Sequence, residues 1–490
     1  MTTRYLPSRE QFDELRLKHN VVPVWTEVVA DLETPVSTYM KLVQGAAPDS
    51  VSFLLESVEH GERWGRYSFV GVDPFLVLTS HGGKVDISGD PMGEISDGTP
   101  LEIVRQVLKA FSSPTMPELP PLIAGGVGFL GYDVVRYLEK LPQTTVADVE
   151  VPELMLIFAR TLFVFDHLRQ RLTVVSNVVG DDTYDEAMAR TGRLVAKLGE
   201  PLVYTPKGVG PVEFDLPPST LGERGYMDAV ERAKEYIRAG DIFQVVPSHR
   251  FSAPQPEDPF AVYRTLRLVN PSPYMFFLKH PEITLVGSSP EPLIKVQGRR
   301  VLQRPIAGTR PRGATDEEDL ALEQDLLADA KERAEHVMLV DLARNDLGRV
   351  CTYGTVEVEE FMVIERYSHV MHMTSQVVGE LAEGMTGLDA LYASFPAGTV
   401  SGAPKIRAME IIDELEPTRR GPYSGVVGYF DFSGNLDTCI ALRTAYVAGG
   451  KIYIQAGGGI VADSDPRTEW LETVNKAKAL LTAWAMARPD

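Results

Sequence analysis

Two pairs of glutamates with equal spacing carry the clearest chemical signal in the sequence. Glu332 and Glu335 lie three residues apart in one expected helix, and Glu469 and Glu472 lie three apart in another. Residues at this spacing share one helix face, so each pair can present two carboxylates in one direction. If the pairs converge, their oxygens suit Mg²⁺, which binds hard oxygen ligands and completes its shell with water and substrate.

Each pair also has an ordinary alternative explanation. The second pair shares its helix face with Lys476, as on a solvated surface. The first lies in a helix expected over 331–347, and Val337 and Val340 make the opposite side apolar, so we expect burial around most of its circumference. A buried carboxylate needs a partner, and Arg333 or Arg344 could supply it in place of a metal. Both explanations stay open on spacing alone.

Two glycine-rich stretches and one arginine indicate a site for an anion. Residues 397–405 run into an expected helix, whose first backbone N–H groups favour negative charge. Residues 455–459 follow an expected strand, and their glycines let backbone N–H groups approach a carboxylate. Arg443, expected on the preceding strand, offers a two-pronged guanidinium to the same kind of group. The alternative is tight turns and a surface arginine, but with the carboxylates these parts predict a small, multiply anionic, metal-assisted substrate.

One pattern has the form of a nucleotide-binding motif without its context. Residues 126–131 spell G-x-G-x-x-G, and Asp148 and Glu150 follow at about the distance of 20 residues that a dinucleotide site requires. Such a site also needs a strand before the glycines and a second strand that bears the acid. Pro120 and Pro121 crowd the first strand, and the acids lie in a polar stretch. We therefore expect these glycines to serve close packing.

His369 and His372 have the spacing of a zinc-binding pair. They fall in an expected strand, 367–378, where an offset of three places the two rings on opposite faces. No cysteine lies nearby in the sequence, so we reject zinc. His372 remains a candidate proton carrier, because histidine titrates near neutrality.

Strand and helix signals predict the framework that must position these residues. Helices are expected at 226–239, 316–328, 331–347, 403–415 and 466–485. Strands are expected at 160–166, 172–179, 242–248, 367–378, 425–432, 437–447 and 451–456. Many strands joined by short turns, with helices inserted, predict an α+β fold of large, mostly antiparallel sheets covered by helices. Prolines and glycines mark a connection at 201–224 between an N-terminal region, 1–200, and a C-terminal region, 225–490.

The composition limits the classes of partner. The 490 residues carry 48 lysines and arginines against 68 aspartates and glutamates, a net charge of −20. This excess argues against a general nucleic-acid binder and against adhesion to anionic membranes. No apolar run approaches the ~18 residues of a membrane span, and the first residues lack a signal-peptide core. Two cysteines, Cys351 and Cys439, allow one disulfide at most, so we expect a cytoplasmic protein.

Several long motifs, in order along residues 225–485, resemble those of the chorismate-utilising enzymes. They are residues 304–309 (RPIAGT), 341–346 (DLARND), 398–405, 421–425 (GPYSG) and 455–460. Two further stretches, 54–57 and 270–275, are similar to the family's allosteric tryptophan pocket. The resemblance implies the family's fold, in which two large, mostly antiparallel sheets pack as a sandwich covered by helices. Within the family, the chain is most similar to the large subunits that form anthranilate.

The resemblance also implies a reaction in two steps. Ammonia adds at C2 of chorismate while the 4-hydroxyl departs, and elimination of pyruvate then gives anthranilate. In such an enzyme Mg²⁺ clamps the ring carboxylate and neutralises charge near the leaving hydroxyl. Glu291 is similar to the family's acid that protonates this hydroxyl, a role that needs a pKa raised by burial.

Further roles follow from the same resemblance, residue by residue. Glu335 and Glu472 would hold Mg²⁺, with Glu332 and Glu469 beside them, and His372 would assist the elimination. Thr309 and Thr399 would line the pocket. The expected substrate-binding residues are Tyr423, Arg443, Gly457, Gly458, Gly459, Lys476 and Gln244, of which Tyr423, Arg443 and the Gly459 amide would bind the enolpyruvyl carboxylate. The expected tryptophan-binding residues are Leu55, Glu56, Ser57, Pro273, Tyr274 and Met275.

Two positions distinguish this chain from related activities. Aminodeoxychorismate synthases carry a nucleophilic lysine where this sequence has Ala307. Isochorismate and salicylate synthases activate water with a lysine at the position that resembles Gln244. A neutral amide cannot be that base, which favours ammonia as the nucleophile. These activities, and a non-catalytic relative that only binds tryptophan, remain the alternatives.

The chain shows no glutaminase of its own. That activity needs a nucleophilic cysteine in a strand–turn–helix elbow with a partner histidine. Cys439 lies in a strand-like run, and Cys351 shows no such setting. We therefore expect ammonia to come from a separate glutamine amidotransferase subunit, component II in the two-component members of the family, in a heterotetramer.

Overall fold

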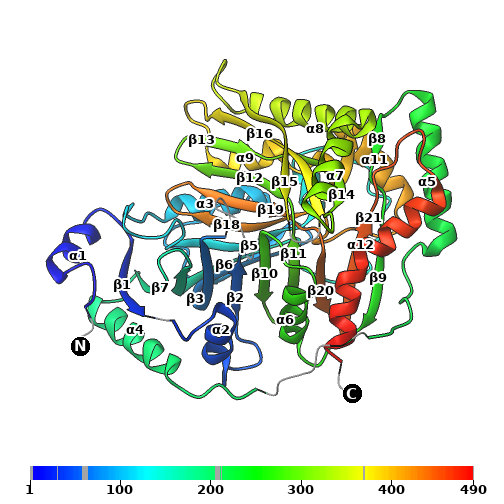
Figure 1. Ribbon diagram of the computed structural model, residues 1–490. Coiled ribbons are helices and arrows are strands. Elements are labelled where there is room, and N and C mark those ends of the chain that lie inside the picture. The colour runs from blue at the N-terminus through cyan, green and yellow to red at the C-terminus, as the bar shows by residue number, and fades with distance from the viewer. Residues whose placement is uncertain are drawn as a thin grey trace.

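The computed structural model describes residues 4–29, 31–57, 65–204, 210, 212–367 and 370–488 (Figure 1). These residues form an α+β fold in which helices cover a large antiparallel sheet network, as predicted. No helix among them is both long and apolar enough to cross a membrane.

The N-terminal region contributes seven strands to this network. Its elements are α1 (Arg9–Arg16), β1 (Val21–Val29), α2 (Pro35–Val43), β2 (Ser52–Glu56), β3 (Tyr67–His81), β4 (Lys84–Gly89), α3 (Pro100–Ala110), β5 (Gly125–Leu130), the 3₁₀ helix η1 (Tyr132–Tyr137), β6 (Leu154–Asp166), β7 (Arg171–Val179) and α4 (Tyr184–Leu198). The connection follows α4.

The C-terminal region begins with a helix and contributes the remaining strands. Its elements are α5 (Gly222–Ala239), β8 (Gln244–Val245), β9 (Ser248–Pro254), α6 (Pro259–Val269), β10 (Tyr274–Lys279), β11 (Thr284–Ser289), β12 (Pro292–Gln297), β13 (Arg300–Gln303), β14 (Ile306–Pro311), α7 (Asp316–Ala328), α8 (Ala330–Gly348), β15 (Glu357–Arg366), β16 (Val370–Glu380), α9 (Gly387–Ser394), α10 (Gly398–Ser401), β17 (Gly402–Ala403), α11 (Lys405–Leu415), β18 (Val426–Asp431), β19 (Leu436–Ile440), β20 (Thr444–Ala448), β21 (Lys451–Gly457) and α12 (Pro466–Met486).

The two expected layers are joined by long strands. Nineteen strands form one hydrogen-bonded network, and β8 and β17 form a small separate pair. The register of β3 against β6 shifts between Pro74 and Leu76, a bulge that tolerates proline because it needs no N–H there. Strands from both sides of the connection pair directly, β2 with β10 and β5 with β18.

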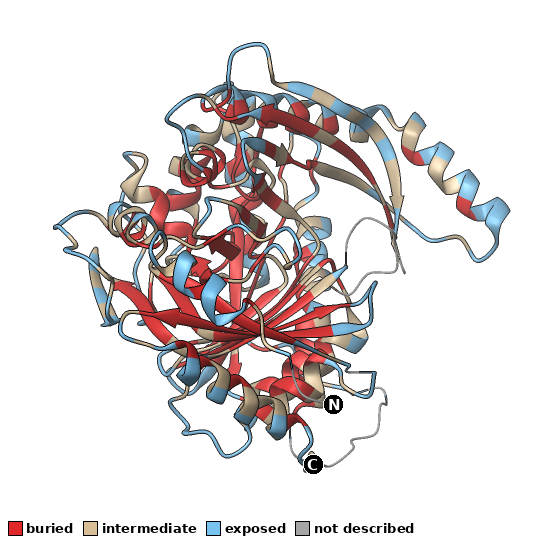
Figure 2. Ribbon diagram, turned by 90° about the vertical axis from the view of Figure 1, so that its left-hand side faces the viewer, coloured by how far each residue is buried: buried red, intermediate tan, exposed pale blue. Residues whose placement is uncertain are grey.

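Side chains of β6 show how one strand serves both layers. Ile157 and Val164 pack into a central core made of strand and loop residues, which lies between the layers. On the other face, Phe158 belongs to the core beneath α3, α8 and α9, whereas Phe163 belongs to the core beneath α2, α5, α6 and α12. In Figure 2 the central strands are mostly buried and the outer loops exposed. Helices therefore cover the two outer faces of a sandwich.

Several elements match the prediction closely. α7 has the predicted bounds, and α12 begins at Pro466, where the Asp465 side chain accepts the N–H of Thr468. The expected strand 437–447 is wrong, because it divides into β19 and β20 around residues 441–443. The expected strand 242–248 also breaks, at Pro247, which lacks the N–H that a strand interior needs.

The predicted burial of α8 is wrong in part. The helix buries one face, with Leu339, Ala343 and Leu347, against the sheet. Of the two apolar residues expected on the opposite side, Val340 is 4% exposed, whereas Val337 is 41% exposed and faces solvent. The apolar residue there suggested a second buried face that the fold does not cover.

The G-x-G-x-x-G stretch forms β5 rather than a nucleotide loop. β5 lies between β6 and β18, and no side chain fits at its centre. A Cβ added to Gly128 would lie 1.8 Å from the carbonyl oxygen of Met155. These glycines therefore permit close strand packing, as expected.

Candidate functional site

A cavity of about 220 Å³ brings together residues from distant parts of the sequence. It lies among β14, β16, β21, the loop after β11 and the break between β19 and β20. Nine of the expected site residues line it: Glu291, Thr309, His372, Thr399, Tyr423, Arg443, Gly457, Gly459 and Lys476. A site of this size fits a small ligand.

Arg443 occupies the break in the expected strand. Its φ of +45° is a left-handed conformation that costs energy for a residue with a side chain. Its carbonyl accepts the N–H of Ser288 at 3.1 Å, so β11 holds the turn. Burial lowers the pKa of the guanidinium, but nearby Glu291 and Glu472 oppose this effect. The result is a partly buried cation at the cavity wall.

Glu291 is the acid of the cavity. Burial raises the pKa of its carboxyl to about 7, against the opposing effects of the Thr399 hydrogen bond, Arg443 and Lys476. Thr399 Oγ1 donates to Glu291 Oε1 at 2.7 Å. The backbone carbonyl of Glu291 accepts the N–H of Ile440 at 3.0 Å, which ties Glu291 to β19. A carboxyl held in this way can give up a proton near neutral pH.

Thr309 and His372 lie opposite each other on β14 and β16. His372 Nδ1 is 3.0 Å from Thr309 Oγ1 and 3.2 Å from the Gly308 carbonyl oxygen. If Nδ1–H donates to this carbonyl, Nε2 keeps its lone pair. Burial lowers the pKa of His372, which favours the neutral ring. His369 lies outside the described residues.

The glycines after β21 differ in their surroundings. Gly457 pairs with Ser248, and its carbonyl accepts Lys476 Nζ at 3.1 Å. Gly459 lies so close to Gln244 that a Cβ would come 2.5 Å from Nε2. Gly458 and Gln244, both expected to bind substrate, do not line the cavity, and the Gly458 N–H donates to the Tyr226 hydroxyl at 3.1 Å.

The two glutamate pairs lie beside these cavity segments. Gln244 Nε2 donates to Glu335 Oε1 at 3.1 Å. A Cβ on Gly308 would lie 3.2 Å from Glu332 Oε2, and one on Gly458 would lie 3.1 Å from Glu469 Oε2. The fourth acid, Glu472, pairs with Lys476 at 2.7 Å. Gln244 therefore links the α8 pair to the glycines that end near α12.

The acids have partners other than those first considered. Glu332 Oε1 lies 3.5 Å from Arg310 Nη1, whereas Arg344 pairs with Asp341. Burial and the neighbouring acid of its pair raise the pKa of Glu332 and of Glu469, against Arg310 and the Ser464 hydrogen bond respectively. In each pair, one acid therefore lies where its charged form is disfavoured.

The donor set fits Mg²⁺ in part. Within the described ranges, no three or more Asp, Glu, His or Cys side chains are grouped closely enough to hold a metal unaided. Mg²⁺ usually takes only one or two carboxylates and keeps water and substrate oxygens. Two carboxylate pairs beside a cavity for an anion are consistent with that pattern.

Part of the site was missed in the sequence. Besides Ala307, which the sequence had singled out, the cavity wall contains Val246, Pro290, Ile306, Val400, Leu442, Gln455 and Ala456. Most of these residues lie next to an expected site residue in the sequence, and this position was the one sequence feature that could have indicated them. Gln244 Oε1 is buried and has no hydrogen-bond partner among the described residues, a feature that no sequence pattern indicates.

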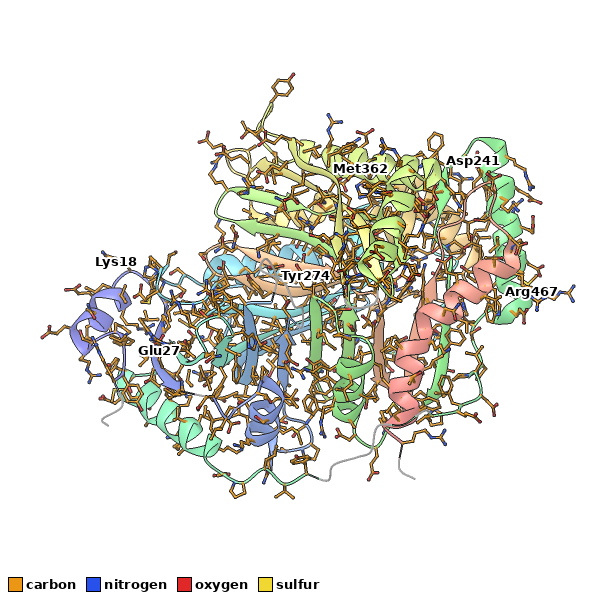
Figure 3. All side chains as sticks on the ribbon, viewed as in Figure 1. Lys18, Glu27, Asp241, Tyr274, Met362 and Arg467 are labelled. Carbon is orange, nitrogen blue, oxygen red and sulfur yellow. The ribbon has the colours of Figure 1, made fainter. Side chains whose placement is uncertain are left out.

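A second cavity, of about 270 Å³, contains all six residues expected to bind tryptophan. Its wall includes Leu55, Glu56, Ser57, Pro273, Tyr274 and Met275. The sequence did not indicate Lys295 and Asp437, which also line it. Asp437 accepts the Tyr274 hydroxyl and pairs with Lys295, both at 2.8 Å. Tyr274 lies near the middle of the molecule (Figure 3).

Comparisons with known proteins agree with this geometry. Residues 52–482 match the family described as chorismate binding enzymes. Anthranilate synthase component 1 of Mycolicibacterium smegmatis is 49% identical over 98% of this chain and 94% of its own. That of Pseudomonas aeruginosa is 47% identical over 98% and 99%.

Solved structures extend the comparison. Anthranilate synthase component I of Streptococcus pneumoniae superposes with a TM-score of 0.75 at 34% identity, covering 92% of this chain and 98% of its own. The menaquinone-specific isochorismate synthase of Escherichia coli, at 20% identity and a TM-score of 0.68 over 97% and 98%, shares the fold. The chain therefore belongs to the chorismate-binding enzymes and, within them, to the anthranilate synthase component 1 proteins.

Proposed function

We propose that the chain converts chorismate and ammonia to anthranilate and pyruvate, that it uses Mg²⁺, and that tryptophan inhibits it from the second cavity. The observation that carries this function is a single cavity that joins the cations Arg443 and Lys476 to Glu291, an acid with a pKa of about 7. Chorismate is a dianion with a hydroxyl leaving group, so it requires both features.

Binding orients the substrate before any bond changes. Arg443 and the Gly459 amide receive the enolpyruvyl carboxylate, and Tyr423 closes the same side of the cavity. A guanidinium can form two parallel hydrogen bonds with a carboxylate, which fixes the ring as well as holding it. Bound Mg²⁺, held by Glu335 and Glu472 with Glu332 and Glu469 nearby, would neutralise the ring carboxylate.

In the amination step, a C2–N bond forms and the C4–O bond breaks. Glu291 gives its proton to the departing hydroxyl, which leaves as water. Gln244 Oε1 is buried and has no hydrogen-bond partner among the described residues, which supports a role for this oxygen as acceptor of an N–H of ammonia. The amine then releases one proton, so the step is balanced.

In the elimination step, C2 loses its proton and the C3–O bond to the enolpyruvyl group breaks. The ring becomes aromatic and the side chain leaves as pyruvate. Neutral His372, with Nδ1 held by the Gly308 carbonyl, supports proton movement through Nε2. Ala307 lines the cavity and offers no amine for a covalent intermediate.

A separate glutamine-hydrolysing subunit supplies the ammonia in this proposal. Cys351 and Cys439 are both buried, and burial raises the pKa of Cys351 to about 11. Such thiols are poor nucleophiles. Two free cysteines also support a cytoplasmic location, and the partner class supports a heterotetramer.

The test uses the full chain with chorismate, ammonium and Mg²⁺, and follows anthranilate fluorescence and pyruvate release. We expect both products in equal amounts, and glutamine to replace ammonium only with a glutaminase subunit present. Chelation of Mg²⁺ should abolish turnover, and Glu335→Gln should raise the Mg²⁺ requirement at least 10-fold. Exposed Glu357→Gln is the matched control. Isochorismate or aminodeoxychorismate as the only product would refute the assignment.

A further inference from the structure

The end of the G-x-G-x-x-G stretch contacts the segment that carries Tyr423. Directly after β5, the Tyr132 N–H donates to the Gly421 carbonyl oxygen at 2.8 Å. In return, the Gly421 N–H donates to Asp133 Oδ2 at 3.0 Å. A Cβ on Gly131 would lie 2.8 Å from the same Gly421 oxygen, so only glycine allows this approach. The N-terminal region thus fixes both backbone groups of Gly421.

Arg420, the preceding residue, is buried between two aromatic rings. It is 1% exposed, and its guanidinium carbon lies 4.6 Å from the Tyr132 ring centroid and 5.7 Å from that of Tyr423. Its nitrogens donate to the carbonyl oxygens of Val246 at 2.6 Å and Val400 at 2.7 Å. Tyr423, Val246 and Val400 all line the chorismate cavity. One side chain therefore joins three cavity walls from behind.

Glu416 extends this support to a fourth wall. It accepts from Arg420 Nη2 at 2.6 Å and from both the N–H and the hydroxyl of Ser248 at 2.8 Å. Ser248 Oγ in turn accepts Gln455 Nε2 at 2.8 Å, and Gln455 lines the cavity. Because the buried charges are paired and hydrogen-bonded, neither is left uncompensated. The pair favours one arrangement of the walls.

Backbone strain shows why such support is needed. Ser424, directly after Tyr423, has a φ of +63°, which is unfavourable for a residue with a side chain. The Ser424 hydroxyl accepts from Arg420 Nη1 at 3.3 Å, and the Ser424 N–H donates to the Ala441 carbonyl. The turn that presents Tyr423 is therefore held by Arg420 on one side and by the chain leading to Arg443 on the other.

We propose that Arg420 is a positioning residue for the chorismate cavity: it packs against Tyr132, and Tyr132 and Asp133 of the N-terminal region fix the adjoining Gly421. It touches no substrate and acts through Tyr423, Val246 and Val400. This role rests on the function proposed above. It also accounts for the G-x-G-x-x-G stretch, because the close packing of β5 that these glycines allow brings Tyr132 against the Arg420 guanidinium.

The decisive comparison is Tyr132→Leu with Tyr132→Phe. In the part of the chain that the structure describes, the buried Tyr132 hydroxyl has no hydrogen-bond partner, so Phe keeps the ring and should leave kinetics unchanged. Leu removes the ring beneath Arg420 and should lower kcat/KM for chorismate about 10-fold, mainly through KM, because small displacements of binding groups are costly. KM for ammonium should change less than 2-fold. Equal changes for both substrates, or none, would overturn the proposal.

Replacement of the ion pair provides a second, independent measurement. Arg420→Met combined with Glu416→Gln avoids a lone buried charge, which a single substitution would create. This variant should also raise KM for chorismate more than KM for ammonium, with native circular dichroism. If it does not fold, the Tyr132 comparison decides. If wild type makes no anthranilate, the proposed function fails, whereas an active wild type with unaffected variants contradicts only the positioning role.

Discussion

At the residue scale, protonation of Glu291 should set the pH dependence of the reaction. Burial raises its pKa to about 7, and a general acid works only in its protonated form. We expect kcat/KM for chorismate to be highest below pH 7 and to fall about 10-fold for each pH unit above it, as the proton is lost.

Two substitutions test this assignment. Glu291→Gln should reduce kcat by about 10²–10⁴-fold and remove this limb of the pH profile. Thr399→Val removes a hydrogen bond that lowers the pKa of Glu291, so the limb should move to higher pH. Steady-state rates between pH 5.5 and 9 give the measurement, with exposed Glu357→Gln as control. A limb that stays in place in Glu291→Gln assigns the proton to another group.

At the element scale, the central glycine of β5 tests how tightly the strands pack. A Cβ on Gly128 would lie 1.8 Å from the Met155 carbonyl oxygen, and backbone there cannot move without disturbing β6. Gly128→Ala should lower the free energy of unfolding by about 3 kcal/mol or more. Gly348→Ala, at the end of α8 where nothing lies within 4 Å, is the control and should be neutral or slightly stabilising. Urea unfolding measures both, and equal values would contradict the tight packing.

Local chemistry decides which elements the sequence reveals. α12 was predictable because Asp465 and Pro466 mark its start, and the glycine motifs because their spacing is local. The break at Arg443 was not predictable, because it depends on a hydrogen bond from Ser288, which lies 155 residues earlier in the sequence. Arg420 was missed for the same reason. Its hydrogen bonds run to Val246 and Val400, in other elements.

At the scale of the whole molecule, one strand connects the two cavities. In β10, Tyr274 and Met275 line the second cavity and pair with Ser289 and Ser288 of β11. Ser288 donates its N–H to the Arg443 carbonyl. Ser289 Oγ donates to the Ile440 carbonyl at 2.6 Å and accepts the Glu291 N–H at 3.3 Å. A displacement of β10 would therefore reach both the cation and the acid of the chorismate cavity.

This connection predicts that tryptophan and chorismate weaken each other's binding. Because coupling between two sites is a property of the complex, tryptophan should weaken chorismate binding by the same factor by which chorismate weakens tryptophan binding, about 5–150-fold. Calorimetry on Glu291→Gln with Mg²⁺ measures both affinities without turnover. Ser57→Ala should weaken tryptophan binding and leave chorismate affinity unchanged, because Ser57 lines the second cavity and is not part of the chorismate cavity. Tryptophan binding with no effect on chorismate affinity would show that β10 and β11 do not transmit the signal.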